Sequence, residues 1–96
     1  LQERTDKFAK IIGVLPSSVS IKNYKARWGS CSTNGAIDFN WKIIQAPKKV
    51  IDYIVVHELC HLLEHNHSPK YWRCVEKFMP NSKDSKNWLK ENADLL

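Results

Sequence analysis

The feature that most constrains this chain is the stretch His57-Glu58-Leu59-Cys60-His61, which matches the pattern H-E-x-x-H. Residues four apart on a helix lie on the same face, so His57 and His61 can bind one metal ion together. Glu58 follows the first histidine directly, and from there its carboxylate can reach water at that ion. The pattern predicts a helix here and makes zinc-dependent hydrolysis the first functional hypothesis.

His67 is the best candidate for a third metal ligand. If the helix ran straight through His65, that residue would lie roughly 12 Å along the axis from His57 at ~1.5 Å per residue, too far for a shared tetrahedral centre. His67 lies beyond the expected helix end, where Asn66 can adopt the left-handed conformation that turns the chain back. Three protein ligands leave the fourth position of zinc to water, which is the catalytic pattern, and Glu58 would be the general base.

Other interpretations of these histidines stay open. The ligand spacing equals that of the metzincins, but Glu64 stands where those proteins have glycine, which disfavours that class. His57 and His61 could instead be hydrogen-bonded core residues, or ligands of a closed zinc site completed by a cysteine. Cys60 points to another side of the helix from His61, and buried packing is the expectation for it. We expect the same for the other two cysteines, Cys31 and Cys74.

Length and composition bound the class of protein. The 96 residues have room for one domain, residues 1–96. The chain begins at Leu1 and has neither a signal peptide nor an apolar run of membrane-spanning length, so we expect a soluble piece of a longer protein without a membrane partner. Three cysteines without a disulfide framework favour a reducing compartment, the cytoplasm. The net charge of +5 permits binding to nucleic acid, but the basic residues are scattered, which favours a solvated surface.

Helical patterns occur in four segments. The first carries Phe8, Ile11, Ile12 and Leu15 at roughly helical spacing and stops before a proline. Proline also fits the first position of the second segment, and Ser68-Pro69 forms an N-cap followed by proline in the first turn of the third. The expected helices are residues 3–14, 47–63, 69–79 and 84–93.

A β-hairpin is expected between the first two helices. Residues 19–32 and 36–44 are rich in β-branched and aromatic residues, and the Asn34-Gly35 pair between them suits a tight turn. Ile37, Phe39 and Trp41 alternate, so the second strand should have one apolar face. Gly29 inside the first strand indicates a bulge or a close approach of backbone.

Further motifs accompany the histidines in a fixed order between residues 20 and 90. They are Arg27-Trp28-Gly29-Ser30-Cys31-Ser32, Gly35, Asn40-Trp41, Pro47, Asp52-Tyr53, His57 to His61, Asn66-His67-Ser68, Tyr71-Trp72 and Trp88-Leu89. Together they resemble the YgjP-like zinc metallopeptidase domain, a relative of the SprT-like and WLM groups of small gluzincin-type proteases. The resemblance implies a zincin-like α+β fold: a small antiparallel sheet packed on the H-E-x-x-H helix, with an N-terminal helix and one or two C-terminal helices.

The resemblance also implies site residues. It assigns one Zn²⁺ to His57, His61 and His67, and it assigns the general base to Glu58. In longer family members an N-terminal part precedes this region, and here it is reduced to one helix.

Other residues are weaker candidates for the site. Arg27 to Ser32 is expected to form an edge strand that pairs with an extended peptide, although Trp28 could simply be buried there. Tyr71 follows His67 by four residues, so it could approach the metal water or an oxyanion, and a packing role is an equal alternative. Arg27 and Arg73 are candidates for stabilising negative charge, with solvated surface as the default. Residues that could orient the imidazoles are Asp52, Asn66 and Ser68.

The leading hypothesis is a monomeric zinc metallopeptidase that acts on a peptide or protein substrate. One alternative is a non-catalytic, zinc-stabilised interaction module that contacts nucleic acid through its basic surface. Another keeps the metal chemistry and changes the substrate to a non-peptide amide.

Overall fold

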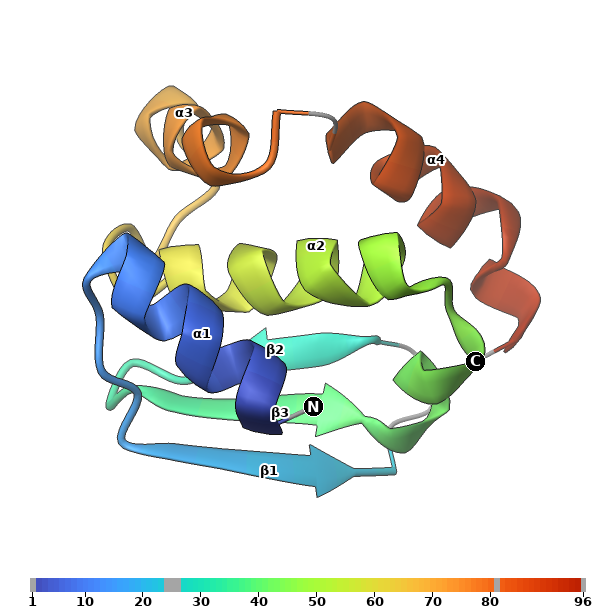
Figure 1. The fold of residues 1–96 in the computed structure, drawn as a ribbon, viewed down its shortest axis with the longest axis horizontal. Helices are drawn as coiled ribbons and strands as arrows, with labels where there is room; N and C mark the ends of the chain where they lie inside the picture. Colours follow the sequence, from blue (N-terminus) through green and yellow to red (C-terminus); the bar gives the residue numbers. More distant parts are fainter. Residues whose placement is uncertain (1, 24–26, 81, 96) are drawn as a thin grey trace.

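The computed structural model describes residues 2–23, 27–80 and 82–95 of the chain (Figure 1). All four expected helices are present, with ends displaced by a few residues. They are α1 (Gln2–Ile12), α2 (Lys48–Cys60), α3 (Pro69–Phe78) and α4 (Ser82–Glu91). The strands are β1 (Ser18–Lys22), β2 (Gly29–Cys31) and β3 (Ala36–Asn40), and two 3-10 helices are η1 (Trp41–Gln45) and η2 (Ala93–Leu95).

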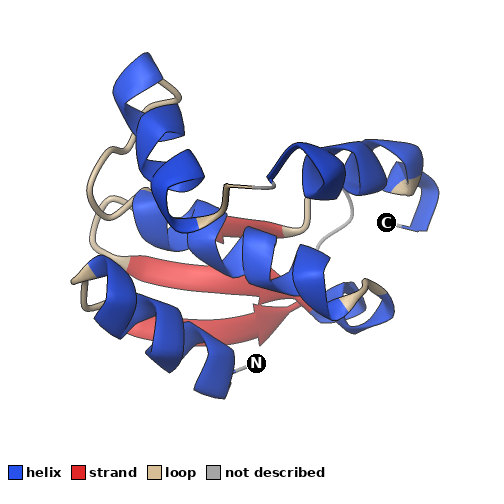
Figure 2. Cartoon of the chain, turned by 45° about the horizontal axis from the view of Figure 1, so that its top comes forward, coloured by secondary structure: helices blue, strands red, loops and turns tan. Residues whose placement is uncertain are grey.

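Helix α2 is the central element of the molecule. It contacts α1, α3, α4 and strand β2. Figure 1 shows the sheet in the lower part of the view, α2 across the middle beside β2, and α3 and α4 above α2. In Figure 2 the helices lie on one side of the three strands. The result is the α+β arrangement that the family resemblance implies, with the sheet against the H-E-x-x-H helix.

The sheet has the strand order β1-β3-β2 and is mixed. Strands β2 and β3 form the expected antiparallel hairpin, and Gly35 in its turn has a φ of 88°. The expected antiparallel pairing covers β2 and β3, whereas β1, whose partner the sequence left open, runs parallel to β3. The expected strand over residues 19–32 is in fact two strands, which flank β3 from opposite sides, and residues 24–26 of that segment lie outside the described part.

Two predicted apolar faces need correction. Ile37 and Phe39 of β3 are fully buried, but Trp41 is 45% exposed. The strand ends at Asn40, whose side-chain oxygen caps η1 by accepting from the backbone N–H of Lys42 at 3.0 Å. In α1 Thr5 and Ala9 are buried, and Phe8 and Ile12 of the predicted apolar face pack against the core. Ile11 is exposed, and so is Leu15, which lies beyond the end of the helix.

The second helix is buried, as its apolar sequence predicts. Val55, Val56 and Leu59 are fully buried, and Pro47 is the N-cap rather than the first helical residue. The helix ends at Cys60, before the predicted end at Leu63. None of the helices in the described ranges is long and apolar enough to cross a membrane.

Candidate active site

His57, His61 and His67 converge at the C-terminal end of α2. His57 lies in the last turn of α2, His61 is the C-cap of that helix, and His67 precedes Ser68, the N-cap of α3. One ring nitrogen from each histidine lies within 4.8 Å of those of the other two. Tetrahedral zinc with bonds of about 2.0–2.1 Å needs ligand nitrogens ~3.3 Å apart, so modest side-chain movement closes this group around an ion. His65 is exposed and lies outside the group.

The turn between α2 and α3 differs from the prediction. The predicted left-handed conformation of Asn66 is wrong, because no described residue other than glycine has a positive φ. The backbone N–H groups of Leu63 and Glu64 donate to the carbonyl of Cys60, which tightens the helix end. The side-chain oxygen of Asn66 then accepts from the N–H of Ser68 at 3.3 Å. These contacts of the backbone and of the Asn66 side chain turn the chain so that His67 comes close to His57 and His61.

The orientation of His61 is fixed by a backbone group. Its Nδ1 lies 3.1 Å from the carbonyl oxygen of Glu64. With the proton on Nδ1 this contact is a hydrogen bond, and the lone pair of Nε2 is left for a metal. Burial lowers the pKa of His61, which favours the neutral imidazole that binds metal. Sequence reasoning missed the role of Glu64, because a backbone carbonyl leaves no signal in residue type.

Glu58 lies beside the histidines and against strand β2. It is 6% exposed, and its Oε2 is 3.5 Å from Nδ1 of His57. A side chain at Gly29 would lie 3.2 Å from Oε2 of Glu58 and 3.0 Å from the backbone oxygen of Asp38. The close approach expected at Gly29 is therefore confirmed, and its absent side chain leaves room for the carboxylate.

Tyr71 of α3 contacts both His57 and His61. It is fully buried, and its hydroxyl donates to the backbone carbonyl of His57 at 2.8 Å. Its ring stacks on His61 with centroids 4.3 Å apart, and burial raises the pKa of its hydroxyl. These contacts favour the packing role over a contact with an oxyanion. Trp72, which sequence reasoning did not place at the site, stacks on His67 at 5.6 Å.

The remaining candidates lie in different places. Asp52 pairs through both oxygens with the guanidinium of Arg4, which links α1 to α2. Ser68 caps α3 by accepting from the N–H of Tyr71. Arg27 lines the cleft beside the histidines, whereas Arg73 is exposed on α3.

The three cysteines, which were alternative metal ligands, lie outside the group of converging histidines. The sulfur of Cys60 lies 3.2 Å from that of Cys74, and Cys60 is fully buried. Neither residue belongs to the group of converging ligands, and neither does Cys31. Within the described residues, the geometry favours three histidines over a closed site with a cysteine ligand.

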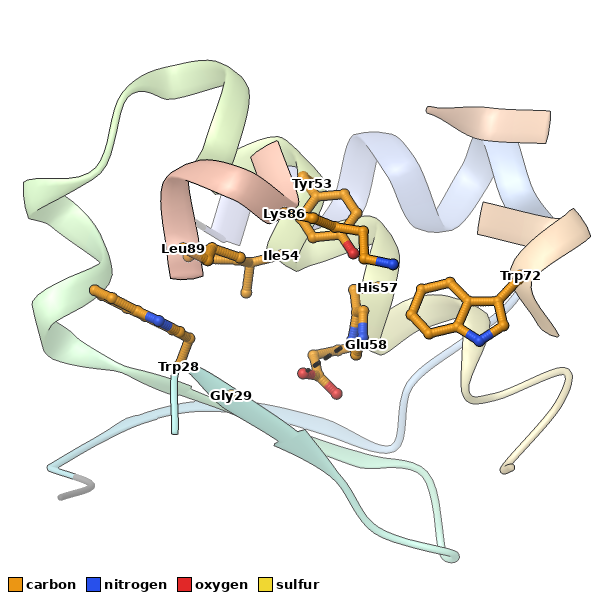
Figure 3. Close-up of a pocket in the computed structure, with 9 residues that line it drawn as sticks. All are labelled: Trp28, Gly29, Tyr53, Ile54, His57, Glu58, Trp72, Lys86 and Leu89. Carbon is orange, nitrogen blue, oxygen red and sulfur yellow. Dashed lines mark ion pairs between the residues drawn. The ribbon is translucent and has the colours of Figure 1, made fainter. Parts of the chain in front are cut away.

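Two pockets meet at the histidines. The first, of about 300 Å³, is the aromatic pocket drawn in Figure 3 and includes Trp28, Ile54 and Trp72 among its walls. The second, of about 250 Å³, is the histidine pocket and is lined by His61, His67 and Arg27 among others. Both pockets include His57, Glu58 and Gly29. His57 and Glu58 thus lie midway along a cleft with an apolar and a polar side, and His61 and His67 lie on its polar side.

Comparisons with known proteins agree with this geometry. The family model "YgjP-like, metallopeptidase domain" matches residues 1–92. The crystal structure of the metallopeptidase zymogen of Pyrococcus abyssi abylysin is similar, with 25% identity, a TM-score of 0.81, and coverage of 94% of this chain and 92% of that one. The metallopeptidase zymogen of Methanocaldococcus jannaschii jannalysin shares the fold at 19% identity, with a TM-score of 0.77 and coverage of 99% and 96%. No curated protein matches the sequence.

Proposed function

This chain belongs to the family of YgjP-like metallopeptidase domains, and we propose that it cleaves peptide bonds with one zinc ion held by His57, His61 and His67 and with Glu58 as the general base. The observation that carries the proposal is the placement of Glu58 beside three converging imidazoles in a cleft. When bound, zinc would polarise the substrate carbonyl and lower the pKa of a water at the site.

The protein groups have separate tasks. Glu58 takes a proton from the attacking water and passes it to the leaving amine, a role that requires its carboxylate within hydrogen-bond reach of the reacting atoms. The carbonyl of Glu64 holds the tautomer of His61, and Tyr71 holds the backbone of His57. Glu58 and His61 are buried, so bulk water competes little for the Glu58 carboxylate or for the contact between His61 and the carbonyl of Glu64.

Strand β2 supports a peptide as the substrate. It lies at an edge of the sheet, and its first residue, Gly29, lines both pockets. An extended chain that pairs with this edge would place its backbone across the cleft, with side chains directed to either pocket. This mode of binding holds a scissile bond without demanding one particular sequence.

The test is cleavage of an unfolded protein by wild type and by Glu58→Gln, with bound zinc quantified in both. We expect Glu58→Gln to keep its zinc and to lose about 10²- to 10⁴-fold in rate, the usual contribution of a general base. Glu64→Gln is the matched control, because it makes the same change on a neighbouring residue whose backbone, not its side chain, contacts His61.

Both solved neighbours are described as zymogens, so each sample is assayed before and after limited proteolysis. Cleavage by Glu58→Gln at the wild-type rate would refute Glu58 as the base. If zinc-loaded wild type fails to cleave under either condition, the non-catalytic interaction module takes the place of this proposal.

A further inference from the structure

The aromatic pocket has a chemical character that the hydrolytic residues do not explain. Beyond His57, Glu58 and Gly29, its walls are mainly apolar side chains: Trp28, Tyr53, Ile54, Trp72 and Leu89. Figure 3 shows Trp28, Ile54 and Leu89 on one side of the pocket and Trp72 on the other, with Glu58 and His57 between them. Trp72 also stacks on His67, but none of these apolar groups binds metal or transfers a proton.

The walls come from separate elements that the tertiary structure brings together. Trp28 precedes β2, Ile54 belongs to α2, Trp72 to α3 and Leu89 to α4. Trp28 also packs on Trp88 with ring centroids 6.1 Å apart, and Ile54 is only 3% exposed. The pocket is therefore built on packed side chains, as sites that bind an apolar group are.

One of the residues that line this pocket is an exposed lysine, Lys86. The Nζ of Lys86 lies 4.2 Å from the centroid of the Trp72 ring, and Lys86 also lines the pocket. Glu58 lines this pocket together with Lys86, and Glu76 lines an adjoining pocket with it, but neither carboxylate lies within 4.0 Å of the ammonium group. Asp84, two residues before Lys86, pairs with Lys49. Within the described residues, no carboxylate forms an ion pair with Lys86.

We propose that the aromatic pocket binds a large apolar side chain of the substrate next to the scissile bond, and that Lys86 selects a carboxylate near that side chain over a cation. This inference rests on the proposed peptidase function and names the substrate class for the same site. The carboxylate is either an acidic side chain of the neighbouring residue or the C-terminus of the peptide, since both present the same group to an ammonium ion.

The expected discrimination follows from burial and charge. Removal of a large apolar side chain from water in such a pocket favours it over alanine by about 10- to 100-fold in kcat/KM. A carboxylate near Lys86 should raise kcat/KM by a further few-fold, and a lysine there should lower it by a similar factor. The effect is small because Lys86 is exposed and solvent screens its charge.

The experiment begins with cleavage sites mapped by mass spectrometry in an unfolded protein. Peptides then present Phe, Leu, Ala or Gly beside the cut and Glu, Gln or Lys at the next position. A second set of peptides ends at the residue that carries the large apolar side chain, with either a free C-terminal carboxylate or a C-terminal amide. Comparison of the two sets distinguishes a side-chain carboxylate from the C-terminus as the group that Lys86 selects. We expect Phe and Leu to exceed Ala and Gly by about 10-fold or more.

Two pairs of variants test the pocket itself. Leu89→Trp fills the pocket and should abolish the preference for large side chains while cleavage of Ala peptides persists; Leu15→Trp, at a residue 92% exposed and outside the pocket, is its control. Lys86→Glu should reverse the preference between Glu and Lys. Lys90→Glu, the same change at an exposed position of α4 that does not line the aromatic pocket, should not.

Binding is measured separately with zinc-loaded Glu58→Gln, by anisotropy of labelled peptides. If that protein binds Phe peptides more tightly than Ala peptides and Leu89→Trp removes the difference, the pocket inference holds even where wild type fails to cleave. If Glu58-dependent cleavage is indifferent to the side chain and to Leu89→Trp, the pocket inference is overturned and the peptidase proposal stands. An unchanged charge preference in Lys86→Glu overturns the role of Lys86.

Discussion

At the residue scale, the position of Glu58 depends on the absence of a side chain at Gly29. Gly29→Ala would place a methyl group 3.2 Å from Oε2 of Glu58 and 3.3 Å from its Cγ, so the carboxylate must move. We expect kcat to fall roughly 10- to 100-fold, because a small displacement of a catalytic group costs this much, while zinc content stays unchanged.

Gly35→Ala is the control for this substitution. Gly35 has a φ of 88° and lies in the hairpin turn away from Glu58, so alanine there is strained by about 1–2 kcal/mol. It should lower the free energy of unfolding and leave kcat of the folded protein unchanged. If both variants are less stable and both keep the wild-type kcat, the absence of a side chain at Gly29 does not position Glu58.

The third ligand is also a question of single residues. His67→Ala should weaken zinc binding by at least about 100-fold, since even the loss of a group that only orients a ligand costs 10- to 100-fold. His65→Ala removes an exposed imidazole from the same turn and should change the affinity little. Competition with a zinc-chelating dye gives both constants. If both variants lose zinc affinity equally, His67 is not the third ligand.

At the element scale, the ion pair between Arg4 and Asp52 joins α1 to the active-site helix. Its bidentate geometry assigns Asp52 to the packing of these two helices rather than to the histidines. Asp52→Asn and Arg4→Met should each lower the thermal midpoint by a few degrees and leave zinc affinity and kcat of the folded protein unchanged. A loss of zinc affinity confined to Asp52→Asn would instead show that Asp52 supports a ligand.

Local patterns predicted the elements better than their partners. The helix from Pro47 and the caps at Ser68-Pro69 are encoded by neighbouring residues, so α2, α3 and the positions of His57, Glu58 and His61 followed from the sequence. The parallel pairing of β1 with β3 did not, because strand propensity carries no information about which strand lies alongside. Trp41 was misplaced because Asn40 ends the strand by capping η1.

At the scale of the whole molecule, the pocket walls were beyond prediction for a related reason. Trp28, Trp72 and Leu89 are far apart in the sequence, and only the packing of α3 and α4 on α2 brings them to one pocket. Their residue types suggest core positions, and nothing local separates a core tryptophan from one that lines a cleft.

The whole core also determines how stability depends on pH. Burial raises the pKa of Tyr53 to about 12, and it raises the pKa of the Cys60 thiol and of Tyr71 as well. The unfolded chain therefore releases these protons at lower pH than the folded protein, so stability is fully present near neutral pH and is lost as pH rises from about 9.

Denaturant unfolding of the metal-free protein between pH 8 and pH 11 measures this loss. Tyr53 alone should account for about 1 kcal/mol by pH 11, because its pKa in the unfolded chain is about 10. Tyr53→Phe should flatten the pH dependence by that amount. An identical slope in wild type and Tyr53→Phe would contradict the burial effect at Tyr53.

The most direct measurement of the active site is X-ray absorption at the zinc edge of the zinc-loaded protein. Three imidazoles and an open fourth position predict only nitrogen and oxygen ligands at about 2.0–2.1 Å, with one zinc per chain. A sulfur ligand near ~2.3 Å would contradict this, because it would show a site closed by a cysteine and unsuited to hydrolysis.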